Sequence, residues 1–491
     1  MNFDETSLTS EDIKKVNLAV QLHAPLVITT YTLPRTKEKY IQDVTSEFLN
    51  KCYQKQMVEP LKFCLGELLT NSKKANTKRV YFLKKNLNIN DELQYNDGMI
   101  SFKEETLANI NYYLEEQKKL GLYIKLMLKV DDDNVTIQIR NNSTLTKSEK
   151  RRINEKLRTA QKYNNVQEVL GKIIDQTEGA GLGIIIIILM LEKLGLSREN
   201  FKISSDDKET ITSMILPVEE KFHQGIKYFN TEFACELSEL PVYEPRFNEL
   251  CDLLKKPDFT KQQLLEILSK DVTLTALLLQ RAAAVNSECC KISQAIDIVG
   301  MDKLRSIYNH ANPFVLPVKN EDLNELWEHA YNTAFFAYNL AQYYYPEALD
   351  SEEVFTAALF HDIACLCQKT VSLEQMEALK QKGLERNYSE QVFNLYKNGG
   401  GHNLGGKEII EKFNLPAKLG IVCEYHNKPE KAPEEYKDLI YTVYLADMLQ
   451  YYQDGMLDFY QFNKEVLAAM NISCEAEIKD IIEKIKQAQK A

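Results

Sequence analysis

Six positions in the last third of the chain carry side chains that commonly bind metal ions. They are His329, the adjacent pair His361 and Asp362, His402, His426 and Asp447. The chain has seven histidines, and four of them fall in this run. Imidazole and carboxylate groups suit Mn, Fe, Ni or Zn as ligands. The pattern therefore predicts a divalent transition-metal site, with Mn or Fe as examples, and metal-assisted hydrolysis of a phosphoester as its chemistry.

Helices must position these six side chains. His361 and Asp362 lie in the apolar string TAALFHDIACL, and we expect one helix over residues 351–367. His361 follows His329 by 32 residues, which leaves room for two helices and a turn. Histidines on several helices of one bundle can converge on a metal in its core. A single histidine here would more simply be a hydrogen-bonded core residue, whereas six positions together favour a metal site.

A second candidate site lies in the first half of the chain, in the string GELLTNSKKA. A helix predicted over residues 58–75 places Glu67, Asn71 and Lys74 on one face, because they are separated by four and three residues. A carboxylate, an amide and a cation on one face suit a magnesium nucleotide, with Glu67 as an acceptor for water. A solvated polar helix face is the alternative interpretation.

Glycines recur in the string EGAGLG, residues 178–183, directly before an apolar run that begins at Ile184. Gly179, Gly181 and Gly183 would let backbone N–H groups approach a phosphate, and the start of the next helix would add its dipole. A tight turn without any ligand is the alternative.

The first half of the chain mixes strand and helix patterns. A β-branched stretch over residues 19–33 predicts a strand or a bent strand pair. Residues 122–130 and 135–140 alternate around an acidic turn and predict a hairpin. Residues 201–204 and 209–216 predict another strand pair.

From about Leu237 onward, the spacing of apolar residues predicts helices only. We therefore expect an α/β domain over residues 1–218, a linker over residues 219–236 and an all-α domain over residues 237–491.

Composition narrows the class of protein. The net charge of −11 argues against a general nucleic-acid binder, whose affinity depends on Lys and Arg contacts to phosphate. Ten scattered cysteines without a CxxC pair indicate reduced thiols. The chain opens with a polar stretch and not a signal peptide, and its longest apolar run, residues 183–191, is far shorter than a membrane helix. We expect a cytoplasmic protein that contacts neither membrane nor nucleic acid.

The glycine and GELLTNSKKA strings together resemble the GHKL family of ATPase domains, which includes gyrase, heat-shock chaperone, histidine kinase and mismatch-repair types. The resemblance covers about 200 residues and implies an α/β sandwich of the Bergerat type, a mixed sheet with helices on one face. It implies that Mg-ATP is the cofactor. The matching residues are Glu67, Asn71, Lys74, Gly179, Gly181, Leu182, Gly183 and Thr210.

One part of the GHKL pattern is changed. The family's first glycine box has Asp-x-Gly after a strand, with the Asp bound to the adenine amino group. This chain has Asn141 and Ser143 at those places. Asn141 can still accept a hydrogen bond but lacks the charge, which would weaken adenine binding by about 1–2 kcal/mol.

The second half resembles an HDOD domain, an all-helical relative of the HD phosphohydrolases. The strings LSELPVYEPRFN, LWEHAYNTAFFA, FHDIACL, GHNLGGKEII, IVCEYHNKPE and YLADML carry the likeness over about 210 residues. It implies that His329, His361, Asp362 and Asp447 are the basic metal ligands. His402 and His426 match the added ligands of binuclear HD-GYP enzymes, and Asp362 would bridge the two metals and carry the hydrolytic role.

Two positions depart from the HD-GYP pattern. Cys365 stands where a catalytic Lys is expected, and Asn427 replaces the second histidine of a pair. Three interpretations remain open. The chain is a bacterial-type signalling protein that couples a nucleotide-binding domain to a metal-binding HDOD domain, a phosphohydrolase regulated by ATP, or a non-catalytic scaffold. A signalling protein is the expected partner, and a homodimer is compatible with each interpretation.

Overall fold

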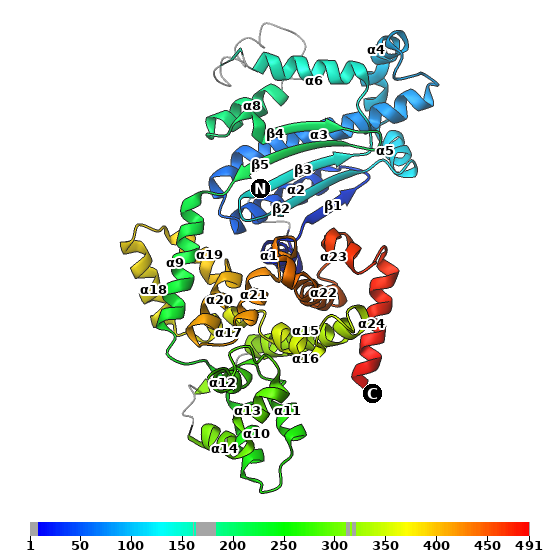
Figure 1. Cartoon of the computed structure of the whole chain (residues 1–491). Helices are drawn as coiled ribbons and strands as arrows, with labels where there is room; N and C mark the ends of the chain where they lie inside the picture. Colours follow the sequence, from blue (N-terminus) through cyan, green and yellow to red (C-terminus); the bar gives the residue numbers. More distant parts are fainter. Residues whose placement is uncertain (1–7, 161, 164–182, 311–314, 317–320, 491) are drawn as a thin grey trace. The chain divides into compact units, whose positions relative to one another are not determined.

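The computed structural model describes residues 8–160, 162–163, 183–310, 315–316 and 321–490. The chain divides into two compact units, residues 1–219 and 220–491 (Figure 1). Each unit has its own set of packed elements, so each is described by itself.

The first unit is built on one antiparallel sheet of five strands in the order β1-β2-β3-β5-β4. The strands are β1 (Leu26–Thr30), β2 (Ile124–Val130), β3 (Asn134–Asn141), β4 (Phe201–Ser205) and β5 (Thr210–Pro217). Short turns join β2 to β3 and β4 to β5, which confirms both predicted strand pairs. The prediction of a mixed sheet was wrong, because each neighbouring pair of described strands is antiparallel. Short hairpins account for two of these pairs, β2–β3 and β4–β5.

Some helices of this unit pack on one face of the sheet, and others pack against those helices. They include α1 (Ser10–Gln21), α2 (Arg35–Lys51), α3 (Val58–Lys84), α4 (Glu92–Ala108), α5 (Ile110–Lys119), α6 (Lys147–Ala160) and α8 (Gly183–Lys193). Burial alternates along β2 and β3, and the buried side chains, such as Leu126 and Ile137, join a core with helices of this layer. The opposite face carries partly exposed polar residues such as Lys125, Gln138 and Arg140. The apolar run from Ile184 is explained by this core, because α8 is buried in it.

The beginning of the first unit differs from the prediction. Residues 10–21 form α1, and β1 starts only at Leu26. Val16 and Ala19 are buried on one side of α1. These β-branched and small residues therefore form the buried face of a helix and not part of a strand.

The second unit is helical, apart from the two-residue strands β6 (Val242–Tyr243) and β7 (Val315–Leu316), which pair in parallel. Its helices are α9 (Glu220–Glu236), α10 (Glu244–Lys255), α11 (Lys261–Leu268), α12 (Val272–Ala283), α13 (Ile292–Val299), α14 (Met301–His310), α15 (Glu321–Tyr344), α16 (Ser351–Leu359), α17 (Ile363–Thr370), α18 (Leu373–Glu385), α19 (Glu390–Lys397), α20 (His402–Lys412), α21 (Ala417–Tyr425), α22 (Lys437–Gln453), α23 (Lys464–Ala469) and α24 (Glu475–Lys490).

The predicted linker over residues 219–236 was wrong, because residues 220–236 form α9. The Phe229 ring lies 5.3 Å from the Phe393 ring and 5.6 Å from the Tyr396 ring, measured between centroids. Phe233 is buried beside Tyr396 as well. The many polar residues of this segment led to the prediction of a linker. Its buried aromatic residues, Phe229 and Phe233, attach it to the core of the second unit.

Candidate metal centre

His361 and Asp362 lie in a break between two helices. α16 ends at Leu359 and α17 begins at Ile363, so the single helix predicted over residues 351–367 was wrong. Adjacent residues of a continuous helix point about 100° apart. The break frees the backbone from that geometry, and both side chains turn toward the same group of histidines.

The other four residues come from four further places in the second unit. His329 lies on α15, His402 is the first residue of α20, His426 follows the last residue of α21, and Asp447 lies on α22. Three of them, His402, His426 and Asp447, are at most 5% exposed. The structure therefore brings all six residues from distant parts of the chain into one buried cluster.

The cluster contains two groups of potential ligands that share Asp362. His329, His361 and Asp362 form one group, and Asp362, His402 and His426 form the other, with the ligand atoms of each group within 4.8 Å of one another. Asp362 Oδ2 lies 3.5 Å from His361 Nε2, while Oδ1 lies 3.3 Å from His426 Nε2. The two oxygens of one carboxylate thus face different groups, as a bridging ligand requires.

Asp447 completes the first group. Its Oδ1 lies 3.0 Å from His329 Nε2 and 3.8 Å from His361 Nε2. Two imidazoles and two carboxylates then surround one point, a donor set that suits a divalent transition metal.

Backbone carbonyls orient three of the imidazole rings. The Nδ1 atoms of His361, His402 and His426 lie 2.7, 2.9 and 2.9 Å from the carbonyl oxygens of Ala358, Gly399 and Cys423. In each case the carbonyl belongs to the residue three positions earlier. A proton held on Nδ1 by a carbonyl leaves Nε2 as the atom with a free lone pair, which is the usual arrangement of metal-binding histidines.

Buried polar atoms at the centre of the cluster have no well-formed hydrogen bond among the residues that the structure describes. They are His329 Nε2, His361 Nε2, Asp362 Oδ1, His426 Nε2 and Asp447 Oδ1. Leaving a buried polar atom without a hydrogen bond costs about 1–3 kcal/mol. Five such atoms directed at one region fit a bound cation that would satisfy them together.

Burial and charge set the protonation of the cluster. Burial alone would raise the pKa of the Asp362 carboxyl, but His361 and His426 hold that pKa well below its usual range. Burial lowers the pKa of His361 and of His402, which favours their neutral, ligand forms. Burial also acts on His426, but its interaction with Asp362 outweighs burial and raises the pKa. A metal would therefore compete with a proton at His426.

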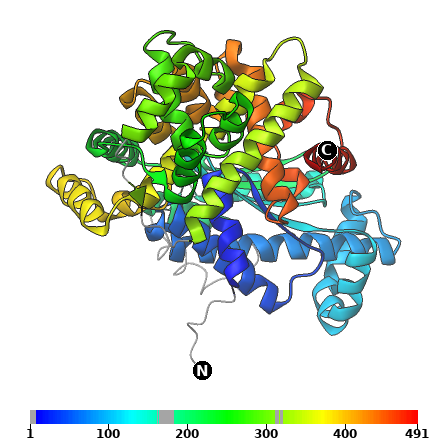
Figure 2. The ribbon, with the colours of Figure 1, turned by 90° about the horizontal axis from the view of Figure 1, so that it is seen from below.

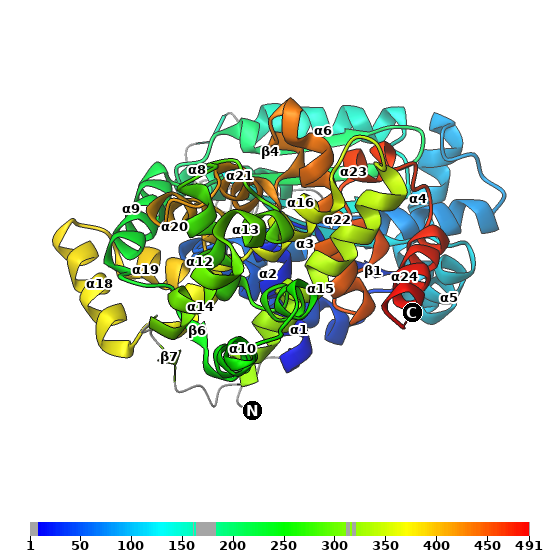
Figure 3. The same ribbon diagram turned by 60° about the horizontal axis from the view of Figure 1, so that its bottom comes forward.

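Glycines allow the helices that carry His402 and His426 to pack closely. A Cβ atom on Gly406 of α20 would lie 2.8 Å from Cys423 Cβ of α21. On its other side, α20 packs against α9, where Asn230 Nδ2 donates to the Gly401 carbonyl at 3.1 Å. α20 thus lies between α9 and α21 (Figure 3).

Two residues of the site were not assigned to it from the sequence. Asn427 Nδ2 lies 3.0 Å from His402 Nε2, so this amide occupies the atom that would bind a metal. The ring of Tyr451 lies 5.1 Å from the ring of His329, between centroids. Tyr451 follows Asp447 by one helical turn, and this spacing could have pointed to it.

The residues expected to bind a nucleotide are only partly brought together. Glu67 Oε2 packs so closely on Gly183 that a Cβ there would clash with it. Asn71 and Lys74 are exposed on α3. Gly179, Gly181 and Leu182 lie outside the described residues, so their role stays a prediction.

Asn141 and Thr210 belong to a buried polar network. Asn141 Nδ2 donates to Asn76 Oδ1 and to the Ser143 carbonyl, both at 3.4 Å. Thr210 Oγ1 donates to the same carbonyl at 2.7 Å, and Ser143 Oγ donates to Asn76 Oδ1 at 2.7 Å. These bonds tie α3 to β3 and β5, which gives Asn141 a structural role. Asn76 was missed because its side chain gives no pattern in the sequence beyond a polar residue on a helix.

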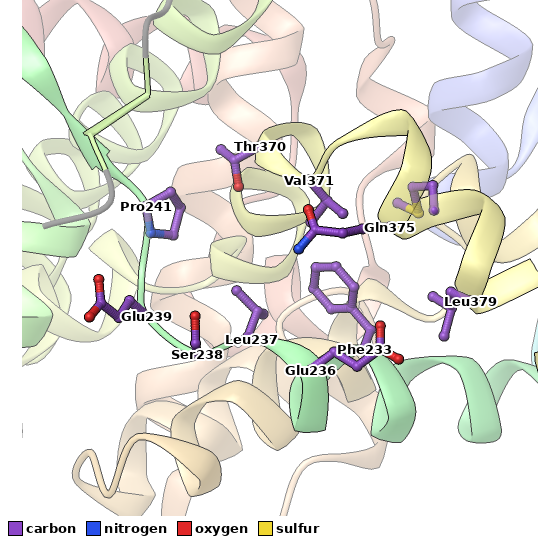
Figure 4. A pocket seen from close by; sticks show the side chains of 11 residues that line it. Phe233, Glu236, Leu237, Ser238, Glu239, Pro241, Thr370, Val371, Gln375 and Leu379 are labelled. Atoms are coloured by element: carbon purple, nitrogen blue, oxygen red, sulfur yellow. The ribbon is translucent and has the colours of Figure 1, made fainter.

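A separate hollow lies between the end of α9 and the segment from α17 to α18 (Figure 4). It encloses about 560 Å³, including its open mouth, and Phe233, Leu237, Pro241 and Leu379 are among its lining residues. None of the six cluster residues lines it. Its size therefore does not identify a functional site.

Comparison with known proteins places five of the six candidate ligands within a recognised domain, while Asp447 lies beyond the matched residues. Residues 240–429 match the HDOD domain. An uncharacterized protein of Treponema pallidum (strain Nichols) is 32% identical over 485 residues, which cover 98% of this chain and 94% of that protein. No helix among the described residues is long and apolar enough to cross a membrane.

Three solved structures are similar to part of this chain. A fragment of the MmoQ response regulator of Methylococcus capsulatus is 16% identical, with a TM-score of 0.39, and covers 48% of this chain and 93% of that chain. A virulence factor of Campylobacter jejuni is 16% identical, with a TM-score of 0.36, and covers 49% and 98%. A putative metal-dependent phosphohydrolase of Shewanella amazonensis is 16% identical, with a TM-score of 0.28, and covers 55% and 99%. With TM-scores below 0.5, these likenesses carry no functional argument.

Proposed function

The chain belongs to the same family as the Treponema pallidum protein and carries an HDOD domain over residues 240–429. We propose that its second unit is a divalent-metal module of a signalling protein. The observation that carries the proposal is a set of five buried atoms, at His329, His361, Asp362, His426 and Asp447, that make no well-formed hydrogen bond among the described residues. A buried cluster of this kind is costly without a cation and satisfied with one.

Phosphoester hydrolysis is the reaction class that this site supports best. Divalent ions bound there would supply Lewis-acid stabilisation of a phosphoryl group attacked by water. Asp362 would bridge the two ligand groups, because its oxygens face His361 and His426 separately. The carbonyls at residues 358, 399 and 423 would keep the imidazoles in their ligand tautomer during turnover.

Cys365 limits the expected rate. Burial raises the pKa of this thiol well above its usual range, so the side chain is uncharged at neutral pH. It cannot supply the positive charge that the Lys of the HD-GYP pattern would bring to a phosphate. We therefore expect slower turnover than in an enzyme with that Lys.

Elemental analysis of protein purified without added metal tests the metal proposal. We expect stoichiometric Mn, Fe or another divalent transition metal, lost in the variant His361→Ala/Asp362→Ala. His23→Asn is the matched control, since it also removes a histidine but lies in the first unit, and Asn tolerates the positive φ of 51° at this position. A metal content near zero in the unaltered protein would refute the proposal.

Hydrolysis is tested separately with bis(p-nitrophenyl) phosphate and cyclic dinucleotides in the presence of Mn²⁺ or Fe²⁺. Turnover that disappears in the same double variant supports the phosphohydrolase interpretation. Metal-loaded protein without turnover of either substrate would favour the scaffold interpretation, in which the metal is structural.

Nucleotide binding by the first unit is a second candidate function, and the packing of Glu67 against Gly183 favours it. A group of cations also lies near this face. Burial lowers the pKa of Lys156, and the neighbouring positive charges of Arg152, Lys74 and Lys78 lower it further. A polyphosphate would relieve that repulsion.

Calorimetric titration of the protein with Mg-ATP tests this second function. We expect binding that Lys156→Ala weakens about tenfold. Lys202→Ala, on a strand that carries none of the candidate nucleotide residues, is the control and should leave the affinity unchanged. No heat of binding at millimolar nucleotide would remove the ATP proposal, and with it the proposed coupling of a nucleotide signal to the metal module.

A further inference from the structure

Helix α4 of the first unit has two apolar faces. One face is buried, with Tyr95 and Gly98 among its residues. The Tyr95 ring stacks on the Phe82 ring at 5.6 Å between centroids, and Gly98 lies so close to Phe82 that a Cβ would come within 2.8 Å of it. This face packs α4 against Phe82 of α3.

The opposite face carries Leu93, Ile100 and Leu107, which we name the α4 stripe. These side chains are 77%, 84% and 64% exposed. Their spacing of seven residues is nearly two helical turns, so the three lie in one row about 20 Å long. Single exposed aliphatic residues are ordinary on protein surfaces, but these three recur at one position of a seven-residue repeat, the period at which paired helices meet.

We infer that the α4 stripe pairs with the α4 stripe of a second copy of this chain, with the two helices parallel. In a parallel two-fold pair each stripe residue meets its own counterpart, so Ile100 packs against Ile100 of the partner subunit. The stripe is then complementary to itself without any other element.

The charges beside the stripe select the parallel direction. On a helical wheel, Asn96 and Lys103 lie on one side of the stripe, and Asp97 and Glu104 lie on the other. A parallel two-fold axis brings Lys103 against Glu104 of the partner subunit, twice per dimer. An antiparallel pair would instead bring Asp97 against Glu104 of the partner subunit, and these like charges would repel.

The charged side chains are available for this pairing. Lys103 is exposed, and neither its ammonium nor the Asp97 and Glu104 carboxylates form an ion pair within the part of the chain that the structure describes. Figures 1 and 2 show α4 with α5 at the end of α3, at the edge of the first unit's own fold.

Sedimentation equilibrium of the full chain over about two orders of magnitude in concentration tests the inference. We expect a monomer–dimer equilibrium in which Ile100→Glu weakens the dimer at least about tenfold. Leu373→Glu is the matched control, because Leu373 is similarly exposed at 83% but lies on α18 of the second unit. Circular dichroism during heating verifies that each variant stays folded.

A charge exchange tests the direction of pairing. Lys103→Glu should weaken the dimer, because it sets two carboxylates against each other, and Lys103→Glu/Glu104→Lys should restore it. A chain that is monomeric at all concentrations would overturn the inference, and the α4 stripe would then be a candidate binding surface for a different protein. A dimer that tolerates Ile100→Glu, or that Leu373→Glu weakens equally, would also overturn it. Failure of the double exchange to restore pairing would overturn the parallel arrangement.

Discussion

At the scale of single residues, Asn427 distinguishes the two ligand groups of the candidate metal centre. Its amide nitrogen lies 3.0 Å from His402 Nε2, whereas His361 Nε2 meets no such amide within the described part of the chain. The group that holds His402 must break this contact before it can bind a metal. In the group of His329, His361 and Asp447, the close contact of His329 Nε2 with Asp447 Oδ1 at 3.0 Å joins two candidate ligands. No side chain outside the ligand set has to leave, so we expect this group to fill first.

The variant Asn427→His tests this difference. It removes the amide from His402 and adds an imidazole, so we expect the second metal to bind about 10- to 100-fold more tightly. Calorimetric titration of metal-free protein with Mn²⁺ gives both affinities. The first affinity serves as the internal control and should stay the same. Equal tightening of both sites would contradict the asymmetry.

Glu149 is the residue on which we expect the first unit's acid sensitivity to depend most. Its buried carboxylate accepts from Arg79 at 2.8 Å and from Lys78 at 2.8 Å. Burial opposes its charge, but Arg79 and Lys78 outweigh burial and hold the pKa of Glu149 below its ordinary value. We expect Glu149→Gln to lower the free energy of unfolding by about 3 kcal/mol at pH 7, because two cations lose their partner.

The pH dependence of this effect has a definite sign. Since the folded-state pKa of Glu149 is lowered, its stabilisation is complete above the ordinary glutamate pKa of 4.5 and is lost as the pH falls below it. The loss is gradual and continues until the pH reaches the lowered folded-state pKa, so most of the stabilisation remains at pH 4. Urea unfolding at pH 7 and at about pH 2 should therefore show the stability difference between the variant and the unaltered protein shrinking in acid. Glu59→Gln, which breaks the exposed pair with Lys62, should cost less than about 1 kcal/mol at either pH.

At the scale of elements, the close packing of α20 on α21 sets the separation of two ligands. The rings of His402 and His426 lie 5.4 Å apart, between centroids. Gly406 permits this approach, because a Cβ atom at its position would lie only 2.8 Å from Cys423 Cβ. A side chain there would have to push the two helices apart.

We expect Gly406→Ala to destabilise the second unit by about 1–3 kcal/mol and to weaken metal binding. Gly420→Ala on α21 is the matched control, because its nearest neighbour would lie at 3.5 Å, an ordinary contact distance. That control should be neutral or gain up to about 1 kcal/mol from helix propensity. Thermal unfolding and metal titration compare the two variants. Equal behaviour would show that the helix spacing does not depend on Gly406.

At the scale of the whole molecule, the boundary between the two compact units falls before α9. The unit that starts at Glu220 includes Phe229 and Phe233, both buried against helices α18, α19 or α20. A boundary at residue 237, as the sequence suggested, would remove both aromatic residues from their core.

A chain of residues 220–491 should therefore fold and bind metal as the full protein does. A chain of residues 237–491 should be less stable by more than about 4 kcal/mol, because two buried aromatic side chains are lost. Unfolding by guanidinium and elemental analysis compare the two. Equal stability of both chains would mean that α9 contributes nothing to the second unit.

The sequence by itself located most of the elements and predicted the type of chemistry. Alternation of apolar residues located β2–β3 and β4–β5, because a half-buried strand repeats every two residues. Residue types identified the six candidate ligands, because few combinations of His and Asp serve the packing of a helix core. These inferences depend on local periodicity or on side-chain chemistry, which a linear sequence contains.

Only the tertiary structure decided how these residues meet. The break at His361 and Asp362, the sharing of Asp362 between two groups and the amide of Asn427 on His402 all depend on contacts between residues far apart in the chain. The role of α9 also depends on a distant contact, because its residue Phe229 packs against Phe393 of α19. Several local conformations of these segments have similar free energy, and long-range packing stabilises one of them. Local sequence patterns do not contain these long-range contacts and therefore do not predict which conformation forms.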